Sequence, residues 1–129
     1  MENAKEEYLK YRILKSDEAL ADARLLAENG RWNACINRLY YSSFYLISAL
    51  LYKYQFPAHT HNGTKTKFFL EFVKTEKIDK DSGKLFSSLF DWRQESDYAD
   101  FVDFDQEVVG PLIDKVIALN KSLKALIQE

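Results

Sequence analysis

The stretch RWNACINRLYYSSFYLISALLYKYQF, residues 31–56, decides the fold that the sequence predicts. Its apolar side chains recur at helical spacing on two neighbouring faces: Trp32, Ile36, Leu39, Leu46, Leu50 and Tyr54 on one, and Tyr40, Phe44, Ile47 and Leu51 on the other. A helix that is apolar over most of its circumference is buried by several neighbours. We therefore place a helix over residues 31–56 at the centre of the fold, ended by Pro57.

Helical patterns flank this central segment on both sides. Residues 4–28 carry an apolar stripe that stops at Asn29-Gly30, where glycine can adopt the left-handed conformation that closes a helix. On the other side, PAHTHNG is typical of a polar loop with Gly63 as its turn residue, and residues 64–75 predict a short helix. A second polar connection, KIDKDSG, follows that short helix.

The C-terminal third predicts two further helices. The first carries Phe86, Leu89 and Phe90 on its apolar face, and its pattern breaks after Tyr98. The last helix is capped by Asp103 or Asp105, and Pro111 either kinks it or is its first residue. Short connections between such helices predict an all-α, up-and-down bundle of four main helices plus one short helix.

Composition agrees with one helical domain over residues 1–129. The chain has 47% hydrophobic residues, 4 glycines and 2 prolines, which excludes a disordered chain and disfavours a β-sandwich. A net charge of -2 argues against broad nonspecific binding to nucleic acid but allows a local basic site. The sequence shows neither a signal peptide nor a run that could span a bilayer, so we expect a cytoplasmic protein with no membrane partner.

Cysteine and histidine give little sign of a metal site. Cys35 is the only cysteine, and we expect it to be a small buried apolar residue. His59 and His61 lie one residue apart on the predicted loop, but no acid or cysteine nearby completes a ligand set. We therefore predict no metal and no cofactor.

A polar stripe interrupts the central helix. Asn37, Arg38 and Tyr41 lie about one turn apart on an element that should be largely buried. A buried arginine needs an acid, a carbonyl or a ligand as partner, and Asp97 is the obvious acid within the chain. Two interpretations stay open: a structural pair of Asp97 with Arg38 or Arg93, or a functional polar pocket.

The stretch FDWRQESDYADF, residues 90–101, adds a second polar group. Arg93 lies at the edge of the apolar face of its helix, which indicates that it points inward. An arginine followed one turn later by an acid and a phenol is also material for a phosphate site. Six lysines make the short helix and its flank basic, which is typical of a solvated face and is the surface to test for RNA: Lys65, Lys67, Lys74, Lys77, Lys80 and Lys84.

Several of these stretches occur in an order that resembles a HEPN domain (higher eukaryotes and prokaryotes nucleotide-binding), in its small stand-alone prokaryotic branch. They are Asn29-Gly30-Arg31-Trp32, NRLYYSSFYLISALL, the His61-Asn62-Gly63 turn and WRQESDY. The resemblance covers the chain from about Ala19 to the last helix. It implies an all-α bundle, a homodimer, and a nucleotidyltransferase partner in a toxin–antitoxin or defence pair.

The sequence departs from the HEPN pattern at the ribonuclease motif. Many HEPN proteins are metal-independent ribonucleases whose active site pairs an arginine with a histidine about one turn later. Here Tyr98 stands where that histidine would be, and a phenol with a pKa of about 10 is a poor base at neutral pH. Pairing with Arg93 would lower the pKa of Asp97 and weaken it as a base.

We therefore predict a HEPN protein that binds a nucleotide or RNA phosphate and does not cut it. The predicted binding residues are Asn37, Arg38, Tyr41, Arg93, Asp97 and Tyr98. One alternative is a metal-independent endoribonuclease with a non-standard site, in which His61 replaces the missing histidine beside Arg93, Asp97 and Tyr98. A second alternative is a non-catalytic dimeric interaction module, in which the polar groups only fix the geometry of the dimer.

Overall fold

The computed structural model describes residues 2–98 and 103–129, with side chains from Ala4 to Asp97 and from Asp103 onward. Over these residues the chain is helical and contains no strand. The elements in order are α1 (Glu2–Glu28), α2 (Trp32–Lys53), α3 (His61–Phe68), the π-helical turn η1 (Phe69–Val73), α4 (Lys80–Tyr98) and α5 (Gln106–Ile127). The prediction of an all-α bundle is confirmed.

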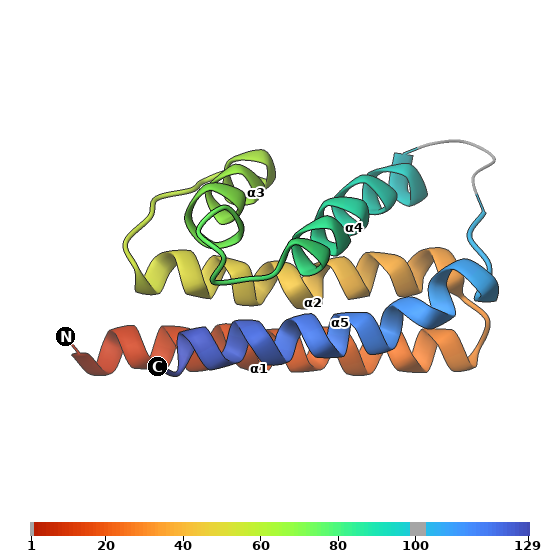
Figure 1. Ribbon diagram of the computed structural model, residues 1–129. Helices are drawn as coiled ribbons and strands as arrows, with labels where there is room; N and C mark the ends of the chain where they lie inside the picture. Colours follow the sequence, from red (N-terminus) through yellow and green to blue (C-terminus); the bar gives the residue numbers. More distant parts are fainter. Residues whose placement is uncertain (1, 99–102) are drawn as a thin grey trace.

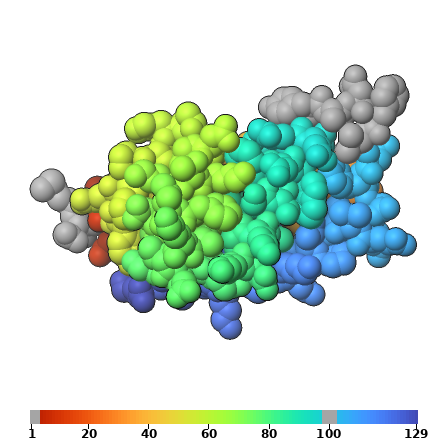
Figure 2. All heavy atoms as spheres, turned by 45° about the horizontal axis from the view of Figure 1, so that its top comes forward, coloured from red at the N-terminus to blue at the C-terminus, as the bar shows by residue number. Residues whose placement is uncertain are grey.

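Helix α2 lies at the centre of the bundle, as its apolar pattern predicted. Figure 1 shows α1, α2 and α5 side by side, with α3 and α4 lying on the other side of α2. In the space-filling view α3, η1 and α4 form a continuous surface over this side of the molecule (Figure 2). Helix α2 therefore has two differently covered sides, one against α1 and α5 and one against α3 and α4.

The core is built mainly from fully buried side chains of α2 and the helices packed on it. Its largest members are Ile36, Leu39, Tyr40, Leu46, Ile47 and Leu50 from α2, Phe68 and Phe72 from α3 and η1, Phe86 and Leu89 from α4, and Leu119 from α5. Cys35 is buried among them as predicted, and burial raises the pKa of its thiol to about 11. This core fixes the positions of the polar residues on α2.

The C-terminal ends of α1 and α2 have the same hydrogen-bonding pattern, but the sequence predicted only the end of α1. After α1, Gly30 is left-handed (φ 68°), and the N–H of Arg31 donates to the carbonyl of Leu26 at 2.9 Å, as in a Schellman motif. After α2, Gln55 takes the same conformation (φ 61°), and the N–H of Phe56 donates to Leu51. Helix α2 therefore ends at Lys53, and the predicted extension to Phe56 is wrong.

The predicted loop around Gly63 is also wrong, because α3 already begins at His61. The hydroxyl of Thr60 accepts a hydrogen bond from the N–H of Gly63 at 2.8 Å and so caps the helix. Gly63 is an ordinary residue of the first helical turn and needs no left-handed conformation. The short helix predicted over residues 64–75 is instead α3 followed by η1, over residues 61–73.

Aspartate caps also set the start of the last two helices. Asp79 accepts hydrogen bonds from the N–H and the hydroxyl of Ser82, so α4 starts at Lys80, inside the predicted polar connection. Asp105 accepts from the N–H of Val108 at 3.0 Å and caps α5. Helix α5 starts at Gln106, so Pro111 lies inside it and is not its first residue.

A fully bonded polar network lies where α1, α2 and α5 meet, and its four residues, Ser16, Ser42, Ser43 and Asn120, are buried. Ser43 donates to Oδ1 of Asn120, and Nδ2 of Asn120 donates to Oγ of Ser42, both at 2.9 Å. The hydroxyl of Ser42 donates in turn to the carbonyl of Ser16. We call these residues the serine–asparagine network.

None of the helices that the structure describes is long and apolar enough to cross a lipid bilayer.

Candidate functional site

Arg93 of α4 points inward, as its position on the helix predicted, and is only 7% exposed. Its guanidinium carbon lies 5.0 Å from the ring centre of Tyr40 and 5.8 Å from that of Tyr41. The nearest acid is Asp97, with Nη1 of Arg93 3.9 Å from Oδ2. Within the described part of the chain, Nε of Arg93 is a buried donor with no hydrogen-bond partner. Two aromatic rings and one distant carboxylate therefore hold this charge.

Asn37 connects the second arginine to Asp97. Its amide nitrogen donates to both carboxylate oxygens of Asp97, at 3.3 and 3.1 Å. Its amide oxygen accepts from Nε and Nη2 of Arg38, at 3.1 and 3.0 Å. Of the two structural pairs that the sequence suggested, Arg93 with Asp97 is present at long range, whereas Arg38 reaches Asp97 only through Asn37.

Tyr41 lies against both arginines. The guanidinium carbon of Arg38 lies 5.0 Å from the ring centre of Tyr41, and that of Arg93 lies 5.8 Å from the same ring centre. Among the described side chains of this group, two arginines face a single carboxylate, which leaves an excess of positive charge. A cavity of about 300 Å³ opens beside Arg38, Asn37 and Asp97. The arrangement is suited to an anion.

His61 enters the same group from the start of α3. Its Nδ1 is 2.8 Å from the hydroxyl of Tyr40, its ring stacks on Phe44 with centres 4.4 Å apart, and Tyr41 lies 5.8 Å away edge-on. Burial, and then the charge of Arg93, lower the pKa of His61. Burial raises the pKa of Tyr40, which is therefore a neutral hydroxyl at physiological pH. We call Asn37, Arg38, Tyr40, Tyr41, His61, Arg93 and Asp97 the Arg93 cluster.

The cluster brings together most of the residues that the sequence suggested. Tyr98 belongs to α4, but its side chain lies outside the described residues. Tyr40 was missed as a site residue, although a fully buried tyrosine needs a partner for its hydroxyl. Lys65 of the predicted basic face lies close to the cluster, with Nζ 4.6 Å from the ring centre of Phe90. Phe90 in turn contacts Tyr40.

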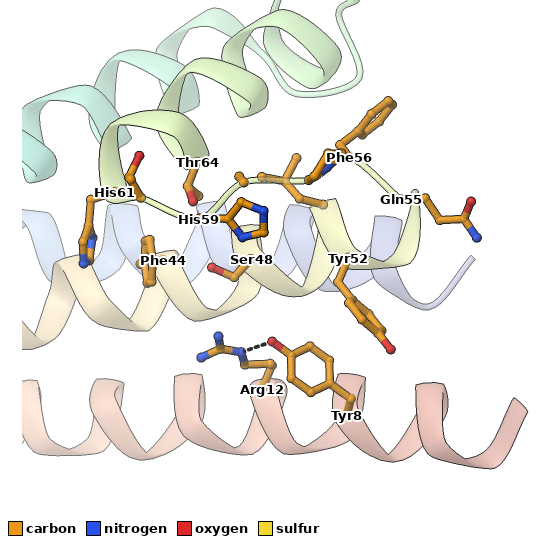
Figure 3. A pocket seen from close by; sticks show the side chains of 14 residues that line it. Tyr8, Arg12, Phe44, Ser48, Tyr52, Gln55, Phe56, His59, His61 and Thr64 are labelled. Carbon is orange, nitrogen blue, oxygen red and sulfur yellow. Dashed lines mark hydrogen bonds between the residues drawn. The ribbon is translucent and has the colours of Figure 1, made fainter. Parts of the chain in front are cut away.

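His59 and His61 do not form part of a metal site in the described residues. No group of three or more His, Cys, Asp or Glu side chains there is arranged to hold a metal ion. Instead, both histidines line a second cavity, of about 650 Å³, between α1, the end of α2 and residues 55–64. Figure 3 shows Arg12 and Tyr8 reaching this cavity from α1, opposite the two histidines.

Comparisons with known proteins agree with the helical architecture. A family model described as HEPN domain matches residues 9–126. A Thermotoga maritima protein named "UPF0332 protein" is 36% identical over 127 residues, covering 98% of this chain and 96% of the relative. An Archaeoglobus fulgidus protein of the same name is 30% identical, covering 92% and 94%. A Methanocaldococcus jannaschii protein named "Putative toxin" is 30% identical, covering 91% and 80%.

Proposed function

The chain belongs to the HEPN domain family, and we propose that it binds phosphate groups of RNA or of a nucleotide at the Arg93 cluster. The observation that carries this proposal is the imbalance of charge: Arg38 and Arg93 flank Tyr41, and Asp97 is the one carboxylate bonded within the cluster. Arginine guanidinium groups bind phosphate through paired, charge-assisted hydrogen bonds. The half-buried Arg38 lies beside the small cavity and makes the direct contact with the phosphate. Arg93 lies against the ring of Tyr41 and contributes a second positive charge.

The test measures the binding of a labelled single-stranded RNA by fluorescence anisotropy. Arg38→Met and Arg93→Met keep the aliphatic packing and remove one charge each, so each should weaken binding by roughly tenfold or more. Arg24→Met on the exposed surface of α1 is the matched control and should bind as the parent does. If both cluster variants bind RNA and nucleotide as tightly as the parent, the assignment is wrong.

A substitution of Asp97 should have the opposite effect on phosphate binding. Asp97→Asn keeps the shape of the side chain but removes the one negative charge bonded to Asn37 and Arg93. Phosphate binding should therefore become tighter by a few-fold, because less charge opposes the ligand. Weaker binding in this variant would mean that Asp97 is needed to orient the arginines.

A metal-independent endoribonuclease is the second candidate function, and the position of His61 favours it. His61 lies against the two tyrosines that contact Arg93, and its lowered pKa keeps the imidazole neutral near pH 7, as a base requires. In this function His61 takes the proton of the ribose 2′-hydroxyl, whose oxygen attacks the adjacent phosphate. The bond from phosphorus to the 5′-oxygen breaks, which leaves a 2′,3′-cyclic phosphate and a 5′-hydroxyl whose proton comes from water. Relatives named as toxins agree with either function.

A cleavage assay on mixed-sequence RNA with chelator present separates the two functions. His59→Ala is the matched control for His61→Ala, since both histidines come from the same short segment. Cleavage by the parent and by His59→Ala, but not by His61→Ala or Arg93→Ala, would establish the ribonuclease. Absence of cleavage by all four proteins, with RNA binding intact, would leave the binding function.

The wider proposal is that the chain works as a homodimer in a toxin–antitoxin or defence pair with a nucleotidyltransferase. Its support is the family membership together with the relatives named as toxins. Exposed apolar side chains on α1, among them Tyr11, Leu14 and Leu25, offer a surface for the second copy. Light scattering should give twice the mass of the chain, and Leu14→Glu should shift it towards the monomer if α1 forms the interface.

A further inference from the structure

The cavity between α1, the end of α2 and residues 55–64 has the features of a ligand site separate from the Arg93 cluster. Its volume of about 650 Å³ lies within the range of small-molecule sites in proteins. Arg93, Arg38 and Asp97 are not among the residues that line it. His61 is the shared residue, with its ring on the cavity wall and its Nδ1 against Tyr40.

Aromatic rings form much of the cavity wall. Tyr8 and Tyr52 pack with their ring centres 4.5 Å apart at one side, and Phe44 stacks on His61 at the other. Phe56 comes from the segment after α2, but its ring points away from Tyr8 and Arg12 in Figure 3 and packs against Phe72. Aromatic and apolar walls favour a flat apolar ligand, because rings stack face to face or edge to face.

The charge of the cavity comes from Arg12. Its Nε donates to the hydroxyl of Tyr8 at 2.9 Å, and its guanidinium carbon lies 5.5 Å from the ring centre of Tyr45. No aspartate or glutamate is among the residues that line the cavity, and no ion pair involves Arg12 in the part of the chain that the structure describes. The guanidinium therefore keeps donors for an acidic group of a ligand, with Ser48 and Thr64 as neutral polar neighbours.

We propose that this cavity binds a small aromatic monoanion, whose ring packs against Phe44 and Tyr52 and whose acidic group pairs with Arg12. The rings select a flat apolar body, and the single uncompensated arginine selects one negative charge. The site does not depend on phosphate binding at the Arg93 cluster, so each proposal can fail without the other.

Two fluorescent probes with the same rings test both features. Anilinonaphthalene sulfonate is an aromatic monoanion that becomes fluorescent in apolar surroundings, and N-phenylnaphthylamine is the same ring system without the acid. Arg12→Met should weaken binding of the sulfonate about tenfold, the usual effect of losing a charge-assisted hydrogen bond. It should leave binding of the neutral probe unchanged. Arg24→Met, on the same helix but outside the cavity, should bind both probes as the parent does.

A second variant locates the bound probe. Ser48→Phe fills the cavity from α2 and should abolish binding of both probes, with circular dichroism confirming that the fold is kept. Arg93→Met should leave probe binding unchanged. The proposal is overturned if the parent does not bind the sulfonate, or if Arg12→Met and Arg24→Met bind it equally. It is also overturned if Arg93→Met weakens sulfonate binding while Arg12→Met does not, since the probe then lies at the Arg93 cluster.

Discussion

Helix α2 carries a polar group on each of its two sides, and the two groups are built in opposite ways. Towards α1 and α5, the serine–asparagine network is neutral, and its side chains bond to one another. Towards α3 and α4, the Arg93 cluster contains two arginines, one carboxylate at 3.9 Å and a buried Nε without a partner in the described residues. We call the first group closed, because its polar side chains bond to one another. We call the second group open, because it has an excess of positive charge and a donor without a partner in the described residues.

This difference distinguishes a structural role from the binding role that we propose for the Arg93 cluster. A buried polar group costs free energy unless it is hydrogen-bonded, so a closed network stabilises the packing of the helices that it joins. An open group with excess charge costs stability and persists where a ligand supplies the missing partner. The serine–asparagine network should therefore be sensitive in unfolding experiments and the Arg93 cluster in binding experiments.

Asn120→Ala, in the closed group, should cause a larger loss of stability than any substitution in the open one. It removes both the acceptor of Ser43 and the donor to Ser42, and it leaves a small cavity between α2 and α5. We expect a decrease of about 3 kcal/mol in the free energy of unfolding, measured by equilibrium urea denaturation. Asn62→Ala on the exposed side of α3 is the control. A similar small effect of both variants would show that the network is not a structural element.

Tyr40→Phe tests the shortest hydrogen bond of the open group. The ring is fully buried and stacks on Phe44 and Phe86, and phenylalanine keeps those contacts. Only the 2.8 Å bond to Nδ1 of His61 is lost, at a cost of about 1 kcal/mol in the same denaturation experiment. A decrease in the free energy of unfolding as large as that of Asn120→Ala would mean that the Arg93 cluster stabilises the fold as much as the serine–asparagine network does.

Periodicity predicted which way residues face along a helix better than how the helices pack on one another. The continuous apolar pattern of residues 31–56 placed α2 at the centre, and the edge position of Arg93 on its helix showed that it points inward. Both features depend on which way a residue faces along one helix, which sequence spacing determines. The contact between Tyr40 and His61 depends on how α3 packs on α2, which spacing within a helix does not determine.

One wrong prediction and one alternative that the structure does not show have local causes. His61-Asn62-Gly63 looked like a turn because Gly and Asn favour turns, but Thr60 supplies a helix cap three residues before Gly63. A direct pair of Arg38 with Asp97 was one of the alternatives that charge suggested, whereas the packing of α4 on α2 places Asn37 nearer. Neighbouring residues on a helix point about 100° apart, so the packing of the two helices decides which one meets the acid.

Arg93→Met should change the free energy of unfolding by less than about 1 kcal/mol, even though Arg93 is almost completely buried. Its contacts with the rings of Tyr40 and Tyr41 stabilise the fold, but burying a charge with an unpaired Nε opposes that gain. Methionine keeps the apolar packing without that cost. Urea denaturation beside Arg24→Met measures the difference, and a loss of several kcal/mol would assign Arg93 to structure.

The smallest expected effect is the pH dependence that His61 contributes. Because burial and the charge of Arg93 lower its pKa, the unfolded chain binds a proton more readily than the folded chain does. The stability contributed by neutral His61 is therefore complete above the ordinary histidine pKa of about 6.5 and is lost as pH falls from there through the lowered pKa of the folded state.

His61→Gln should reduce the slope of stability against pH just below neutrality, while His59→Gln removes the other histidine as the matched control. Arg93→Met should reduce the same slope in part, because it removes one of the two causes of the lowered pKa and leaves burial. Titration of His61 by NMR should then show its pKa rising in Arg93→Met. An unchanged pKa there would show that Asp97 compensates Arg93 fully, and the Arg93 cluster would lose the excess charge that distinguishes it from the serine–asparagine network.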